Sequence, residues 1–164
     1  GVKVVISPRS IKLNKLIRSK DINLNISVGK NESMIDAYIF YDNCSMNTVD
    51  KKFKEYTKKS VNKEPTILRL EQLRLNTILK NHEINKIDYL NIDVEGNEEN
   101  VLDGFALKKY SPELVSIEIH SEKCPPTNNK IYKFFTSNGY KLSSIYGWTY
   151  FFEKFNNRKI HFDY

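Results

Sequence analysis

Carboxylates gather in one short segment, residues 93–99, directly after an apolar run that starts at Ile87. The segment holds Asp93, Glu95, Glu98 and Glu99, with Gly96 among them. In open parallel sheets ligands bind outside the carboxyl ends of the strands, so Asp93 and Glu95 are placed where a ligand would lie. Gly96 lets the backbone approach a ligand closely. The plainer alternative is that Glu98 and Glu99 cap a following helix and Glu95 is solvated. For Asp93 we expect a buried strand end, where a carboxylate needs a partner.

A second cluster lies near residue 118. Glu118 interrupts the apolar run 114–119, and an ionised carboxylate there must be paired or have a shifted pKa. His120 stands at the carboxyl end of the same run. If this strand neighbours the one before Asp93, then Asp93, Glu118 and His120 converge on one crevice. These side chains permit a proton-transfer pair or a hard metal site, although no tight ligand spacing supports a metal and we assign none. A histidine satisfied by a neighbouring carboxylate, without a catalytic role, stays open.

The elements that must position these groups follow from apolar patterning. Strands are predicted at 2–6, 22–28, 35–41, 66–72, 87–94 and 114–120, and helices at 10–17, 75–79, 97–103 and 128–137. A hairpin is predicted for 140–146 and 148–155 around Gly147, and residues 42–64 read as a polar loop with some helix. Residues 22–41 look like two strands joined by a tight turn. Strands alternating with helices indicate an α/β open sheet with helices on both faces.

Composition limits the class of protein. The chain has 164 residues, with 26 Lys plus Arg against 20 Asp plus Glu, for a net charge of +6. Lys outnumbers Arg 21 to 5, as a genome rich in A and T would produce, whereas Arg suits bidentate phosphate contacts. The Lys-rich stretch 51–63 also contains acidic residues, so we interpret it as a solvated face rather than a nucleic-acid patch. No apolar run approaches the roughly 20 residues of a membrane span, and two distant cysteines favour a reduced, cytoplasmic setting.

Several of these segments together resemble the FkbM-type family of S-adenosylmethionine-dependent methyltransferases. The resemblance is carried by Ile92-Asp93-Val94-Glu95-Gly96-Asn97-Glu98, Val101-Leu102, Pro112, Ile117-Glu118-Ile119-His120 and Gly139-Tyr140. Their order and approximate spacing agree with the family pattern, and the resemblance extends more loosely upstream to the 22–28 strand. It implies one Rossmann-like class I methyltransferase domain over residues 1–164. The sheet would be mostly parallel with a C-terminal antiparallel hairpin, and residues 156–164 would be a tail.

The resemblance also implies a function. Such enzymes transfer a methyl group from S-adenosylmethionine to a hydroxyl of a small-molecule acceptor, of which a carbohydrate is one candidate. By position, Asp93 faces cofactor and acceptor, while Val28 and Gly29 correspond to the turn near the adenine. Asp93, Glu95, Glu118 and His120 are the candidate catalytic residues, and which of Glu118 and His120 is the base stays open.

The chain departs from the family pattern at its start. The glycine-rich cofactor loop has no counterpart, and residues 2–6 align with the second strand, so we expect an N-terminally truncated domain. Ser7 occupies the place of the acidic residue that holds the ribose hydroxyls. We therefore expect weak or absent methyl transfer by these residues alone. A non-catalytic Rossmann-like interaction module is the alternative, and a basic nucleic-acid-binding domain is a less favoured one.

Overall fold

The computed structural model of the chain describes residues 4–6, 19–41, 46–120 and 126–155. Its strands are β1 (Val4–Ile6), β2 (Ile22–Leu24), β3 (Ser27–Val28), β4 (Ser33–Ile39), β5 (Thr66–Leu73), β6 (Tyr89–Ile92), β7 (Leu114–Glu118), β8 (Tyr140–Tyr146) and β9 (Thr149–Lys154). Its helices are α2 (Lys51–Val61), α3 (Leu75–Asn81), α4 (Glu98–Asp103), α5 (Leu107–Tyr110) and α6 (Lys130–Thr136). The predicted helix 10–17, the tail 156–164 and Ser7 lie outside the described residues.

The contacts within the chain group into two compact units. One comprises residues 1–85 and 93–106, and the other comprises residues 86–92 and 107–164. The chain crosses between them on both sides of the acidic segment, because β6 belongs to the second unit and α4 to the first. Each unit therefore carries one of the two clusters of candidate residues.

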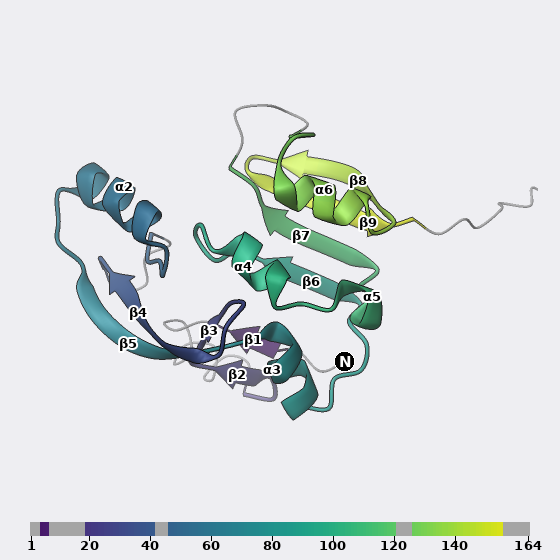
Figure 1. Cartoon of the computed structure of the whole chain (residues 1–164), viewed down its shortest axis with the longest axis horizontal. Coiled ribbons are helices and arrows are strands. Elements are labelled where there is room, and N and C mark those ends of the chain that lie inside the picture. The colour runs from purple at the N-terminus through teal and green to yellow at the C-terminus, as the bar shows by residue number, and fades with distance from the viewer. Residues whose placement is uncertain (1–3, 7–18, 42–45, 121–125, 156–164) are drawn as a thin grey trace, which may run out of the picture. The chain divides into compact units, whose positions relative to one another are not determined.

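The second unit is a four-stranded sheet in the order β6-β7-β9-β8. β6 and β7 are parallel, with Ile92 opposite Ile117, and β9 lies antiparallel between β7 and β8 (Figure 1). One sheet face carries fully buried Val115, Ile117 and Phe152, and Ser116 on the other face of β7 is buried as well. Helix α6 adds Phe135, whose ring stacks on that of Phe152 with 4.7 Å between centroids. The predicted C-terminal hairpin is confirmed, as is the neighbourhood of the strands before Asp93 and His120.

The first unit contains two small sheets. β1 and β2 pair in parallel, and β5 lies between β3 and β4, parallel to the former and antiparallel to the latter. Residues 29–32 join β3 to β4, as the predicted connection of two strands requires, but the two strands do not pair because β5 lies between them. The loop before β5 contains more helix than expected, since Asp50 caps α2 by accepting a hydrogen bond from Phe53 N at 2.7 Å.

The α/β class is confirmed, but the sheet differs from the prediction. The described strands form three sheets, and their six pairings are three parallel and three antiparallel, so a mostly parallel sheet is not what they build. Polar residues shorten two predicted strands, because 22–28 breaks at Asn25 and 87–94 stops at Ile92. Among the described residues, no helix is both long and apolar enough to cross a bilayer.

Candidate functional site

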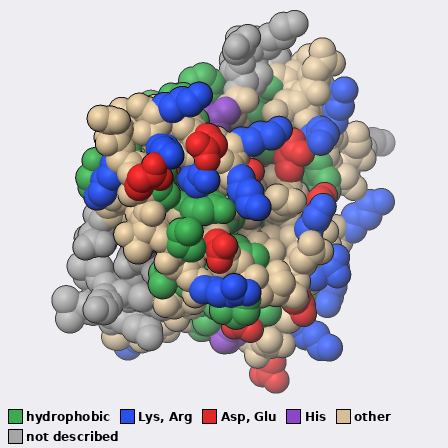
Figure 2. Space-filling model, turned by 60° about the vertical axis from the view of Figure 1, so that its left-hand side comes forward, with side chains coloured by type: hydrophobic (Ala, Val, Ile, Leu, Met, Phe, Trp, Pro, Cys, Tyr) green, Lys and Arg blue, Asp and Glu red, His purple; other side chains and the backbone are tan. Residues whose placement is uncertain are grey.

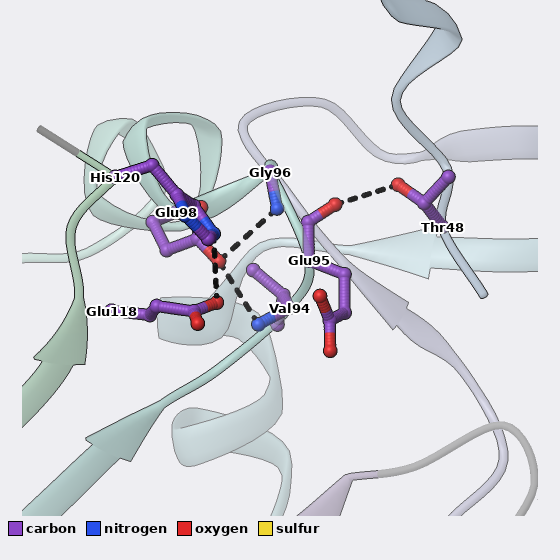
Figure 3. A network of polar contacts seen from close by, with 7 residues as sticks. All are labelled: Thr48, Val94, Glu95, Gly96, Glu98, Glu118 and His120. Carbon is purple, nitrogen blue, oxygen red and sulfur yellow. Dashed lines mark hydrogen bonds and ion pairs between the residues drawn. The ribbon is translucent and has the colours of Figure 1, made fainter. Parts of the chain in front are cut away.

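The acidic segment of the first unit is shaped by Glu98. This residue begins α4 and is 5% exposed, and its carboxylate turns back toward the preceding loop. Its Oε1 accepts hydrogen bonds from the backbone N of Val94 at 3.1 Å and of Gly96 at 3.3 Å (Figure 3). Bonds from backbone N–H groups to a carboxylate are charge-assisted and therefore strong. Glu98 is thus a brace for the loop, a use that sequence reasoning did not separate from helix capping.

The same loop adopts two consecutive left-handed residues. Glu95 has φ +52° and Gly96 has φ +95°, a conformation that costs a non-glycine residue energy and needs surrounding contacts to hold it. One such contact comes from buried Thr48, whose hydroxyl donates to the Glu95 carbonyl at 2.7 Å (Figure 3). A Cβ built on Gly96 would lie 3.3 Å from the Cβ of Phe53 in α2. Sequence reasoning missed the role of Thr48, because its partner is 47 residues away.

Asn97 joins this loop to the predicted adenine-side turn. It is 5% exposed, and its Nδ2 donates to the Val28 carbonyl at 3.0 Å while its Oδ1 accepts from Asn100 at 2.7 Å. Gly29 follows, and its backbone N donates to Leu73 O at 3.1 Å. Val28 is therefore hydrogen-bonded to the acidic loop, and Gly29 follows it in the chain. Their contact with a cofactor stays a prediction.

Asp93 departs from its expected environment. β6 ends at Ile92, so Asp93 is the first residue after the strand and its side chain is exposed. The expectation of a buried carboxylate at a strand end is therefore wrong, because the strand is shorter than its apolar pattern indicates. An exposed carboxylate at this position is accessible to a ligand.

The second unit brings Glu118 and His120 together. His120 Nε2 lies 3.3 Å from Glu118 Oε2, and the side chains are 46% and 19% exposed respectively (Figure 3). The two residues are two apart at the carboxyl end of β7, a spacing that puts side chains on one side of a strand. Trp148 lies on another side of the imidazole, with 5.4 Å between ring centroids.

This pair places a carboxylate within ion-pair distance of an imidazole, an arrangement in which the carboxylate can orient a base. A carboxylate facing Nε2 favours the neutral tautomer that carries its proton there, which makes Nδ1 the basic nitrogen. The same carboxylate stabilises the imidazolium that forms when Nδ1 takes a proton. The pair is therefore chemically able to deprotonate a hydroxyl. The predicted convergence of Asp93 with the Glu118–His120 pair involves residues of both units, and it stays a prediction.

The first unit also has a polar hollow of about 580 Å³. It is lined by groups of both charges, among them Lys30, Lys51, Asp36 and Asp50. The lining includes Asn97 but none of the predicted catalytic residues. The hollow therefore does not by itself identify the site. No cluster of three or more His, Cys, Asp or Glu suited to a metal occurs in the part of the chain that the structure describes.

Two of the five lysines of helix α2 form ion pairs inside its own unit. Lys54 pairs with Glu55 at 2.6 Å, and Lys58 pairs with Glu64 at 2.5 Å. The hydrogen bond with Lys54 lowers the pKa of the Glu55 carboxyl. Lys63 follows the helix and donates to the Phe40 carbonyl at 2.6 Å. In the view of Figure 2, acidic side chains lie among the basic ones. These contacts favour a solvated, mixed-charge face over a phosphate-binding surface.

Comparison with known proteins adds one match. The model of the methyltransferase FkbM domain matches residues 1–142, which include both candidate clusters. No curated protein and no solved structure matches the chain.

Proposed function

Because the chain belongs to the methyltransferase FkbM domain family, we propose that it transfers a methyl group from S-adenosylmethionine to a hydroxyl of a small-molecule acceptor. The observation that carries the hydroxyl assignment is the Glu118–His120 pair, with 3.3 Å between carboxylate and imidazole at the carboxyl end of β7. That edge of a parallel strand pair is where α/β proteins bind ligands. A carbohydrate is our candidate acceptor.

The fold proposal goes with this function. A Rossmann-like class I sheet pairs parallel strands in its middle and closes with an antiparallel hairpin. The order β6-β7-β9-β8, with β6 parallel to β7 and the hairpin beyond, supports that arrangement for the second unit.

The residues of the acidic loop suit the cofactor by charge. S-adenosylmethionine carries a sulfonium and an ammonium cation together with ribose hydroxyls, and carboxylates attract the first two and accept hydrogen bonds from the third. Asp93 is exposed directly after β6, and Glu95 is half-buried at the left-handed turn. In our proposal Asp93 and Glu95 hold the cationic part of the cofactor, while Val28 and Gly29 lie on its adenine side and Ser7 on its ribose side.

The protein's contribution to the reaction is alignment and removal of one proton. When bound, the cofactor supplies an electrophilic methyl group, whose bond to sulfur breaks with the electron pair staying on sulfur as the acceptor oxygen bonds to carbon. Nδ1 of His120 accepts the hydroxyl proton, and Glu118 stabilises the imidazolium that results. The Glu98 brace keeps the loop that presents Asp93 in one conformation, which aligns the reacting atoms.

Calorimetric titration with S-adenosylmethionine tests the cofactor half of the proposal. We expect Asp93→Asn to weaken binding about tenfold, since one carboxylate contact to a cation is lost. Asp103→Asn is the matched control, because it removes an equally exposed carboxylate at the other end of α4. Equal affinities in the wild type and both variants would remove Asp93 from the cofactor site. No binding by the wild type would contradict the cofactor half of the proposal.

A further inference from the structure

Trp148 lies at the same sheet edge as the Glu118–His120 pair. β9 runs antiparallel to β7, so its first residue, Thr149, is opposite Glu118 at the end of β7. The residue before it, Trp148, accepts a hydrogen bond from Ile119 N at its carbonyl oxygen, at 2.8 Å. The turn of the β8–β9 hairpin is thereby fixed beside the carboxyl end of β7. Its backbone is held independently of the indole.

The indole combines exposure with a defined neighbour. Trp148 is 51% exposed, and its ring is tilted by 40° to that of His120, with 5.4 Å between centroids. A single exposed aromatic residue is common on protein surfaces and indicates nothing alone. Here the exposed ring adjoins an imidazole that itself faces a carboxylate at 3.3 Å. A ligand at this position would meet an apolar platform and hydrogen-bonding groups side by side.

We propose that the indole of Trp148 is the platform on which a pyranose ring of the acceptor stacks beside His120. A pyranose has an apolar face of C–H groups and a rim of hydroxyls. The face suits a flat, polarisable ring, and the rim suits the half-exposed imidazole of His120, whose nitrogens form hydrogen bonds with hydroxyls. A flat aromatic acceptor would use the indole but offer the imidazole fewer hydroxyls. This inference rests on the proposed function in one respect, namely that the stacked ring is the one that receives the methyl group.

The chain provides its own probe, because Trp148 is its single tryptophan. We expect the methyl pyranosides of glucose, mannose or rhamnose to cause a saturable change in tryptophan emission, with catechol as the flat aromatic comparison. Saturation-transfer NMR on the same pyranosides extends the measurement to variants that lack the fluorophore. Neither readout needs methyl transfer. A protein that binds pyranosides without methylating them would contradict the proposed function while supporting the platform.

Three variants distinguish stacking on Trp148 from non-specific binding to exposed aromatic residues. We expect Trp148→Ala to weaken pyranoside binding about tenfold or more and Trp148→Phe to retain part of it, by analogy with stacking of nucleobases on aromatic side chains. Tyr146→Ala is the matched control, because it removes an aromatic ring that is 84% exposed from the same hairpin turn. The inference is overturned if no pyranoside binds the wild type, if Tyr146→Ala weakens binding as much as Trp148→Ala, or if catechol binds more tightly than every pyranoside.

Discussion

At the scale of single residues, neighbouring carboxylates of the acidic segment have different environments. Glu98 is buried and accepts two backbone hydrogen bonds, whereas Asp93 and Glu99 are exposed. The sequence pattern separates Asp93 from Glu98 and Glu99, but it gives the latter two the same alternative role as helix caps. Only the fold of the loop, with left-handed Glu95 and Gly96, turns Glu98 inward. Residues that brace a site and residues that face a ligand are thus distinguished by backbone conformation.

Glu98→Ala should lower the free energy of unfolding by about 1–3 kcal/mol, because the N–H groups of Val94 and Gly96 lose their acceptor. Glu98→Gln keeps an oxygen in place and should cost less. Urea titration followed by circular dichroism measures both. Glu99→Ala serves as the control and should change stability by about 0.5 kcal/mol or less, as exposed positions do. Equal losses for Glu98→Ala and Glu99→Ala would show that the brace contributes nothing.

Residue-level prediction from sequence succeeded where the partners are close in the chain. Glu118 and His120 are two apart, so strand geometry alone places them on one side. Their contact at 3.3 Å agrees with the prediction that a carboxylate at this point must be paired. Thr48 and Asn97 were not predicted as loop anchors, because their partners Glu95 and Val28 are 47 and 69 residues away. No local pattern encodes such pairs.

At the scale of elements, local signals predicted most helices and strands, but the strand pairing of the first unit was missed. Helix α4, strand β7 and the β8–β9 hairpin lie close to their predicted positions. β4 pairs with β5 across the 26 residues that separate Ile39 from Thr66, and these include a helix longer than the polar composition of 42–64 indicates. Strand partners so far apart are chosen by tertiary packing rather than by a turn signal.

The hydroxyl of Tyr140, the first residue of β8, links this strand to the segment before β7. It donates to the Pro112 carbonyl at 2.7 Å, and burial raises the pKa of the phenol above 10.0. Tyr140→Phe should lower the free energy of unfolding at pH 7 by about 1–2 kcal/mol, since a buried carbonyl loses its donor.

The same residue predicts a pH dependence. A folded pKa above the unfolded one gives stability that is complete below the unfolded pKa and is lost as the pH rises through the folded pKa. The wild type should therefore lose stability above about pH 10 more steeply than Tyr140→Phe, which has no phenol to ionise. Urea titrations at pH 7, 9 and 10.5 measure this, with Tyr146→Phe as an exposed control. Parallel pH profiles for the wild type and Tyr140→Phe would contradict the assignment.

At the scale of the whole molecule, the net charge of +6 is the difference between 26 basic and 20 acidic residues. The Lys-rich helix α2 pairs two of its five lysines with Glu55 and Glu64, so part of its charge is compensated locally. A protein that binds nucleic acid through phosphates needs uncompensated cations, since release of counterions drives the binding. The charge therefore does not favour a nucleic-acid function.

Binding to a fluorescent 20-base-pair duplex, followed by anisotropy, tests that conclusion. We expect weak binding at low salt that disappears by about 0.15 M salt, because few phosphate contacts are available. The double variant Lys51→Glu/Lys52→Glu should lose this residual binding at low salt and otherwise behave like the wild type. Submicromolar affinity that persists at 0.2 M salt would contradict the interpretation and favour a basic interface.

The central claim is that this methyltransferase-family chain deprotonates an acceptor hydroxyl with His120 supported by Glu118. Single-turnover methyl transfer from S-adenosylmethionine to a pyranoside, followed by mass spectrometry, tests it most directly. His120→Asn should slow transfer by about 10²–10⁴-fold without changing cofactor affinity, as loss of a general base does. His82→Asn, at the end of α3 in the other unit, should transfer at the wild-type rate. Equal rates for His120→Asn and the wild type would contradict the account.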